Sequence, residues 1–81
     1  MNISSLVVRT HPAAVDQVVA AIDRLDRCEI QYRHARGRLV VTIEADTSEQ
    51  ELAIFERIRA LKHVLSADLV FSYEGEIEDE A

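Results

Sequence analysis

The stretch CEIQYRHARGRLVVTIEA, residues 28–45, decides the fold. Apolar and polar side chains alternate from Cys28 to Arg33, which predicts a half-buried strand. Gly37 can take a positive φ in the short loop that follows, and a second strand is predicted from Arg38 to Ala45. The stretch is therefore a β-hairpin. Its inward side chains are expected to be Cys28, Ile30, Tyr32, Leu39, Val41 and Ile43.

A strand and a helix precede the hairpin. The aliphatic centre of the segment from Ile3 to Arg9 predicts a strand. Pro12 then suits the first helical position, because its missing N–H would be unpaired there anyway. Apolar residues at helical spacing predict an amphipathic helix from Pro12 to Asp26. The apolar stripe of this helix consists of Val15, Val18, Val19, Ile22 and Leu25.

A second helix and a last strand follow the hairpin. Ser48 and Glu51 have the spacing of a capping box, in which each side chain binds the other residue's free backbone N–H, so the helix is expected to start at Ser48. The last strand is predicted from Val64 to Tyr73. The helix stripe consists of Leu52, Phe55, Ile58 and Leu61, and the inward residues of the strand are Leu65, Ala67, Leu69, Phe71 and Tyr73.

The resulting order is β-α-β-β-α-β. Right-handed crossovers place both helices on one face of a four-stranded antiparallel sheet, with the first and third strands central. This is an α+β ferredoxin-like sandwich. We expect residues 1–74 to form this single domain and residues 75–81 to be an acidic, disordered tail. The second face of the sheet is left bare.

Strand alternation gives the bare face a composition. Val7, Val40 and Val70 lie on neighbouring strands and should form an apolar stripe flanked by acidic residues. The assignment depends on register, because a slip of one residue turns a strand's side chains to the opposite face. The residues predicted on this face are Ser5, Val7, Arg9, Glu29, Gln31, Arg33, Arg38, Val40, Thr42, Glu44, Asp68, Val70 and Ser72.

Charge and hydropathy exclude several classes of protein. The net charge is −6, but five of the fifteen acids lie between Glu74 and Glu80, so residues 1–73 carry ten acids against nine Lys and Arg, a net charge of −1. A neutral body with an acidic end argues against nucleic-acid binding. No apolar run approaches the roughly 20 residues of a membrane span, and the N-terminus lacks a signal-peptide pattern. Because a single Cys28 cannot form an internal disulfide, a cytoplasmic location is expected.

Motifs for catalysis and for metal binding are missing from the sequence. His11, His34 and His63 lack ligand spacing, and Cys28 is expected to be a buried strand residue. Acylphosphatases need a glycine-rich phosphate loop and a catalytic Asn, but the single Asn here is Asn2. RNA-recognition motifs need aromatic residues on the central strands, and heavy-metal-associated domains need a Cys-x-x-Cys. We therefore expect a binding protein with no cofactor or metal, and not an enzyme.

Basic residues gather around the hairpin. Arg33, Arg36 and Arg38 could bind an anion or an acidic partner. Charged residues at a β-turn are more commonly just solvated. The acidic tail is likewise explained most simply as a solubilising end, and contact with a basic peptide is the alternative.

Three strand segments are informative together: Ser5-Leu6-Val7-Val8, Cys28-Glu29-Ile30 and Val64-Leu65-Ser66-Ala67-Asp68-Leu69-Val70-Phe71. Their combination resembles the NapD family, the assembly chaperones of the periplasmic nitrate reductase. The resemblance extends from Ile3 to about Tyr73 and departs at Asp26-Arg27, where the family tends to have a Pro-Gly turn. It implies a cytoplasmic chaperone that binds the twin-arginine signal peptide of the catalytic subunit NapA. Export through the Tat pathway would be delayed until the molybdenum cofactor is inserted.

A signal peptide that is basic at one end and apolar after it would match a valine stripe bordered by carboxylates. Two other uses of the bare face stay open on the residues alone, namely a homodimer and an ACT-like small-molecule sensor. The resemblance favours peptide binding. The predicted peptide-binding residues are Ser5, Val7, Val40, Thr42, Glu44, Asp68 and Val70.

Overall fold

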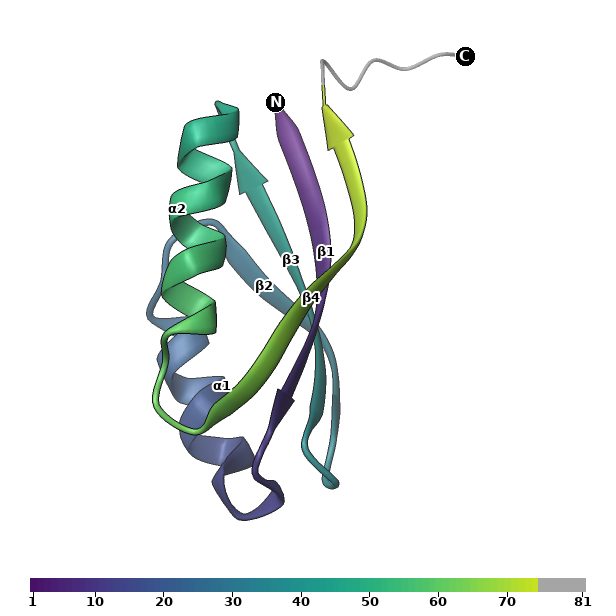
Figure 1. Ribbon diagram of the computed structural model, residues 1–81, viewed down its shortest axis with the longest axis vertical. Helices are drawn as coiled ribbons and strands as arrows, with labels where there is room; N and C mark the ends of the chain where they lie inside the picture. Colours follow the sequence, from purple (N-terminus) through teal and green to yellow (C-terminus); the bar gives the residue numbers. More distant parts are fainter. Residues whose placement is uncertain (75–81) are drawn as a thin grey trace.

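The computed structural model describes the backbone of residues 1–74 and the side chains of residues 1–72 (Figure 1). The predicted tail, residues 75–81, lies outside the described residues. The elements in chain order are β1 (Asn2–Thr10), a 3-10 turn η1 (Pro12–Ala14), α1 (Val15–Asp23), β2 (Cys28–His34), β3 (Arg38–Ala45), α2 (Ser48–Arg59) and β4 (Val64–Glu74). No helix within the described part of the chain is long and apolar enough to cross a membrane.

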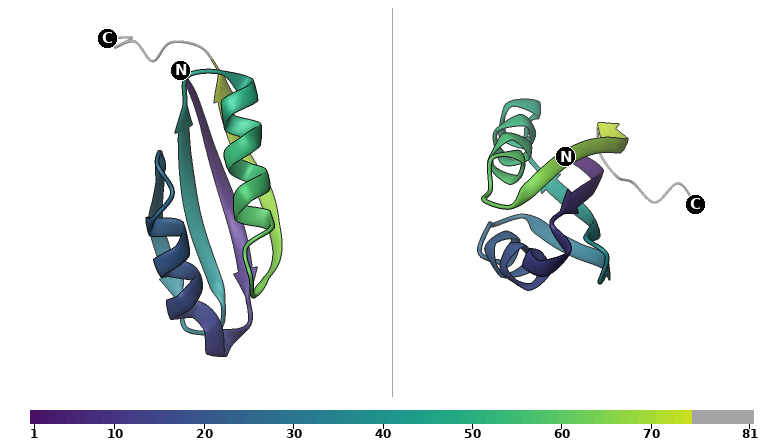
Figure 2. Two further views of the ribbon diagram at one scale, coloured as in Figure 1. Left: turned by 90° about the vertical axis from the view of Figure 1, so that its left-hand side faces the viewer. Right: turned by 60° about the horizontal axis from the view of Figure 1, so that its bottom comes forward.

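The four strands form one sheet in the order β2-β3-β1-β4, and every neighbouring pair is antiparallel. Both helices lie against the same face of this sheet, as the left-hand view of Figure 2 shows. The two βαβ halves therefore interlock with β1 and β3 at the centre. This arrangement confirms the predicted ferredoxin-like fold. It leaves one sheet face uncovered, which we call the open face.

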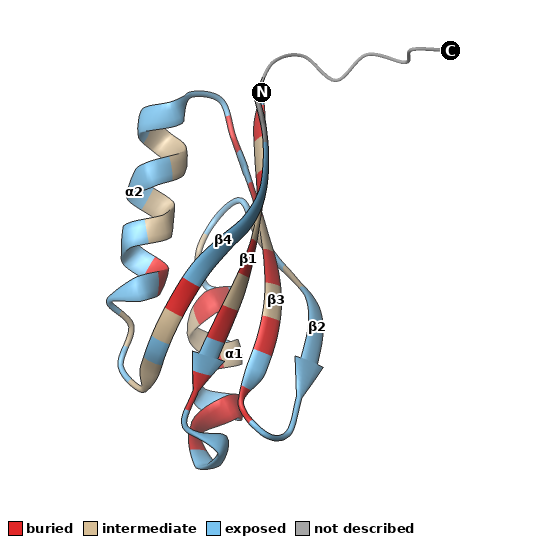
Figure 3. Ribbon diagram, turned by 45° about the vertical axis from the view of Figure 1, so that its right-hand side comes forward, coloured by how far each residue is buried: buried red, intermediate tan, exposed pale blue. Residues whose placement is uncertain are grey.

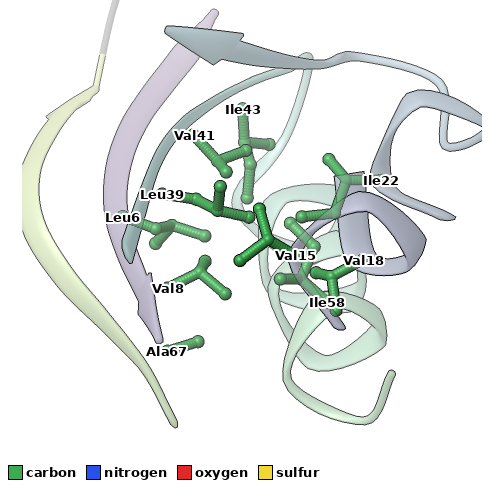
Figure 4. Close-up of a cluster of buried hydrophobic side chains, with 10 residues drawn as sticks. All are labelled: Leu6, Val8, Val15, Val18, Ile22, Leu39, Val41, Ile43, Ile58 and Ala67. Atoms are coloured by element: carbon green, nitrogen blue, oxygen red, sulfur yellow. The ribbon is translucent and has the colours of Figure 1, made fainter. Parts of the chain in front are cut away.

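The hydrophobic core lies between the sheet and the helices (Figure 4). Burial alternates along both central strands, so that one side chain in two points toward the helices. Each aliphatic side chain that is fully buried there contributes about 1.5–3 kcal/mol to folding. The core residues are Leu6, Val8, Val15, Val18, Ile22, Leu39, Val41, Ile43, Ile58 and Ala67.

The N-terminus of α2 differs by one residue from the predicted capping box. The cap is Thr47, whose side chain accepts a hydrogen bond from the backbone N–H of Gln50. The Gln50 side chain in turn accepts a hydrogen bond from the backbone N–H of Asp46. Glu51, which was predicted to cap Ser48, instead accepts a hydrogen bond from the hydroxyl of Ser4 on β1. Glu51 therefore links α2 to β1 of the sheet.

A β-bulge in β2 overturns part of the predicted face assignment. Ile30 is opposite Val41 but Tyr32 is opposite Val40, so Gln31 is an extra residue in the strand. Tyr32 consequently lies on the open face, although it was predicted to point inward. Arg33 was predicted on the open face and lies on the helix side, where its guanidinium pairs with Asp16 of α1.

A second bulge has the same effect in β4. Leu69 is opposite Leu6 and Phe71 is opposite Ser5, so Val70 has no residue opposite it on β1. Phe71 was predicted to point inward and lies instead on the open face. Ser72 was predicted there and lies opposite Ser4, which faces the helices. A third irregularity leaves Leu65 without a residue opposite it, and Leu65 is 58% exposed, so its prediction as an inward residue is also wrong.

The turn before each edge strand contains a residue with a left-handed backbone conformation. Arg27, which precedes β2, has a φ of 70°, and His63, which precedes β4, has a φ of 75°. Glycine takes this conformation without steric cost, whereas a residue with a Cβ is destabilised by contact between the Cβ and the following carbonyl oxygen. A glycine at the position of Arg27 would therefore adopt the same turn with less strain. Here the Arg27 side chain pairs with Asp46 at 3.2 Å.

Gly37 in the β2–β3 turn is expected to be indispensable. Its φ is 100°, and a Cβ added there would overlap the carbonyl oxygen of Thr10. Gly37→Ala should therefore lower the free energy of unfolding by about 2–4 kcal/mol, measured by urea denaturation followed by circular dichroism. Arg36→Ala, in the same turn, is the control and should change it little. Equal stability of the two variants would contradict this account of the turn.

Candidate functional site: the open sheet face

The residues predicted to bind a peptide are distributed over three strands. Ser5 and Val7 on β1 and Val40 and Thr42 on β3 are half-buried and lie on the open face. Figure 3 shows these central strands alternating between buried and more exposed residues, with more exposed strands on both sides. Glu44 follows on β3, and Asp68 on β4 is directly opposite Val7. Val70 is exposed but sits in the bulge, outside the regular pairing.

The pairing brings these residues into rows that cross the sheet. The central row contains Tyr32, Val40, Val7 and Asp68, one residue from each strand. Val7 and Val40 are therefore in contact range as a cross-strand pair. The predicted valine stripe is real on β1 and β3, but its ends are Tyr32 and Asp68 rather than Val70.

A second row contains Glu29, Thr42, Ser5 and Phe71. Two of its polar members, Glu29 and Thr42, are held by Gln31, the extra residue of the β2 bulge. The Gln31 side-chain amide donates to Glu29 Oε1 at 3.2 Å and to Thr42 Oγ1 at 3.1 Å. The bulge thus holds the carboxylate of Glu29 on the open face, in the same row as Phe71.

The two ends of the open face differ in charge. At one end Glu44 lies beside Ile3, next to the row that contains Glu29. At the hairpin end a row of His34, Arg38 and Arg9 crosses β2, β3 and β1. The face therefore changes from acidic through partly apolar to basic along the strands. A ligand whose two ends differ in charge would therefore be recognised in only one direction along the strands.

Sequence reasoning missed two aromatic residues, Tyr32 and Phe71, on the part of the open face whose side chains the structure describes. Tyr32 is 50% exposed and Phe71 is 55% exposed, and both come from edge strands. Regular alternation assigned them to the core, because an extra residue in a strand leaves no clear mark in its sequence. The residue types at the two bulges, a polar Gln31 and a β-branched Val70, are ordinary in strands and do not indicate a bulge.

Reactive chemistry is weak in the part of the chain that the structure describes. Among residues 1–72, whose side chains the structure describes, no group of three or more His, Cys, Asp or Glu side chains could hold a metal ion. Cys28 is half-buried at the start of β2. Burial, with a smaller contribution from the Asp26 carboxylate, raises the pKa of its thiol to about 11. The thiolate, which is the reactive form, is thus strongly disfavoured near neutral pH.

Alkylation of Cys28 by iodoacetamide should reflect this raised pKa. The rate is expected to increase about tenfold per pH unit between pH 7.5 and 9.5 without levelling off, because the thiolate remains a small fraction throughout. In the chain unfolded by urea, the rate should level near the ordinary thiol pKa of about 8.5. A plateau below pH 9.5 in the folded protein would contradict the assignment.

These features define a class, the ferredoxin-like sandwiches with two helices on one face of the sheet and an uncovered second face (Figure 2). The particular family follows from comparison with known proteins. The family described as NapD protein matches residues 1–76, and the chain belongs to this family. The resemblance found in the strand segments is thereby confirmed.

Two curated relatives and one solved structure agree with this assignment. Chaperone NapD of Escherichia coli (strain K12) is 28% identical over 80 residues, which cover 98% of this chain and 92% of the relative. Chaperone NapD of Shigella flexneri gives the same values. The solution structure of the E. coli Tat proofreading chaperone protein NapD superposes with a TM-score of 0.82 at 28% identity, covering 98% of this chain and 84% of that chain.

Proposed function

We propose that this chain is a cytoplasmic, non-enzymatic chaperone that binds the twin-arginine signal peptide of NapA, the catalytic subunit of the periplasmic nitrate reductase. Binding on the open face would delay export until the molybdenum cofactor is inserted. The observation that carries the proposal is the open face of a NapD family member, with an apolar centre and acids at one end. The names of the relatives, chaperone and Tat proofreading chaperone, support the same role.

The size of the face supports a helical ligand. From Ile3 to Arg9 the central strand advances six residues, which is about 20 Å at 3.3 Å per residue. A helix of roughly 13 residues has this length. Tyr32, Val40, Val7 and Phe71 offer the apolar contact that one side of such a helix needs, and the two aromatic rings would flank it.

The charges of the face support a direction for the peptide. Guanidinium groups can make paired hydrogen bonds to carboxylates, and Glu44 and Glu29 lie at the same end of the sheet. The row of Arg9, Arg38 and His34 at the other end would repel a second cationic group. The twin arginines would therefore lie over Glu44 and Glu29, and the apolar part of the peptide would extend toward the hairpin.

Isothermal titration calorimetry with a NapA-type signal peptide tests the proposal. The native peptide should bind, and the double variant Glu44→Lys with Glu29→Lys should bind at least tenfold more weakly, because the two charges proposed to attract the twin arginines become repulsive. Asp23→Lys with Glu49→Lys is the matched control, since both acids are exposed and lie on the helices. Its affinity should stay within threefold of the unaltered protein. No binding of the native peptide would refute the function, whereas equal weakening in both variants would refute the acidic site.

The aromatic residues provide a separate test of the surface. Tyr32→Ala and Phe71→Ala should each weaken peptide binding fivefold or more, because aromatic anchors contribute disproportionately to interfaces. Leu52→Ala is the control, since Leu52 is 58% exposed on α2, in the helix layer. Titration calorimetry at one salt concentration gives all three affinities. A loss with Leu52→Ala as large as with the aromatic variants would place the peptide elsewhere.

A homodimer formed through the open face is a second candidate, favoured by one observation. In a two-fold pairing with antiparallel strands, Arg38 of one copy would face Glu44 of the other, because both residues lie on β3 at opposite ends. Peptide binding would then require the dimer to open. Sedimentation velocity at several protein concentrations, with and without peptide, distinguishes the two candidates.

A further inference from the structure

The hairpin end of the sheet contains a cavity of about 430 Å³ into which the proposed function places no group of the peptide. We call it the basic pocket. It is formed where the β2–β3 turn meets the end of β1, and its lining includes Arg9, Arg36, Arg38 and His34. The structure thereby revises the cluster expected from the sequence, because Arg33 has turned to the helix side and Arg9 and His34 have joined.

The pocket concentrates like charges in a way that costs stability. The two arginines Arg9 and Arg38 are directly opposite each other on β1 and β3. Like charges at directly opposite positions of an antiparallel pair destabilise the sheet. Such a local conflict in an otherwise consistent structure is typical of a functional site.

The arginines of the pocket also lack acidic partners among the side chains of residues 1–72, which the structure describes. Arg27, Arg33 and Arg59 are each paired with a carboxylate, on Asp46, Asp16 and Glu56 respectively. Arg9, Arg36 and Arg38 have no acid within 4.0 Å in the described part of the chain, and no described lining residue of the pocket is acidic. Each guanidinium thus keeps its N–H donors available for a ligand.

Backbone hydrogen bonds hold the walls of the pocket in place. The Thr10 N–H donates to the Gly37 carbonyl at 2.8 Å, and the Gly37 N–H donates to the His34 carbonyl at 2.9 Å. The Arg36 N–H donates to His34 Nδ1 at 3.1 Å, so the hydrogen of a neutral His34 ring lies on Nε2. The turn and the strand end are therefore joined before any ligand arrives, which lowers the entropy cost of binding.

We propose that the basic pocket binds an oxyanion, a group with several phosphate or carboxylate oxygens. Guanidinium groups recognise both kinds of group through pairs of parallel hydrogen bonds. The bound anion would remove the repulsion between Arg9 and Arg38, so that binding and sheet stability are linked. The oxyanion could come from a free phosphate compound or from acidic side chains of a polypeptide that lies on the open face.

Nuclear magnetic resonance titration of the full chain at constant ionic strength tests this site. The probes are inorganic pyrophosphate and the peptide acetyl-Glu-Glu-amide, with sodium chloride as the reference. Saturable shifts of the backbone amides of Thr10, Gly37 and Arg38 are expected with at least one probe. Pyrophosphate alone would identify a phosphate site, and the acidic peptide alone would identify a carboxylate site. Shifts that rise linearly and match those with chloride would overturn the proposal.

Matched variants separate the pocket from general surface charge. The double variant Arg36→Gln with Arg38→Gln should lower the affinity for the probe at least tenfold. The double variant Arg33→Gln with Arg57→Gln removes the same amount of charge outside the pocket and should leave the affinity within twofold of the unaltered protein. Equal loss in both variants would overturn the site. Arg38→Gln should also raise the melting temperature, because it removes a like-charge pair, so lost binding would not reflect unfolding. Signal-peptide affinity, measured separately by calorimetry, reports on the proposed function independently.

Discussion

The antiparallel pairing of β1 with β3 is the constraint on which the rest of the molecule depends. It runs from Asn2 opposite Ala45 to Arg9 opposite Arg38 without a break in register. Because side chains alternate along each strand, this pairing turns Leu6 toward the helices and Val7 away from them. The same register therefore determines both the core and the open face. A slip of β1 by one residue against β3 would turn the side chains of β1 to the opposite face and disrupt both.

The regular part of this pattern could be predicted from the sequence, and the irregular part could not. Element order, the position of the hairpin and the faces of both central strands follow from alternation, from helical spacing and from Gly37. The edge strands differ because Gln31 and Val70 are each one residue too many, and where such a residue is accommodated depends on packing between strands. Tyr32 and Phe71 were therefore assigned to the wrong face. The cap of α2 was also misassigned. Thr47 is the cap, and Glu51, which was predicted to pair with Ser48, accepts a hydrogen bond from Ser4 on β1.

The irregular strands change the chemistry of the open face more than its shape. With regular alternation the face would be a short row of valines between charged residues, suited to many apolar partners. The bulges add an aromatic ring on each side and remove Arg33, while Gln31 fixes Glu29. The result is a surface with an acidic end, an apolar middle and a basic end. Such a gradient distinguishes the two directions of a ligand, which a uniform apolar stripe would not do.

The same bulges have a consequence for the rims of the sheet. An edge strand exposes unpaired N–H and C=O groups, on which another chain can add itself as a further strand and begin aggregation. Both rims here are interrupted, at Gln31 in β2 and at Leu65 and Val70 in β4. An extended polypeptide therefore finds no long straight rim with which to pair. In the proposed role the protein meets apolar segments of other chains, and the interrupted rims would then hinder polymerisation with them and leave the flat side of the sheet for contact.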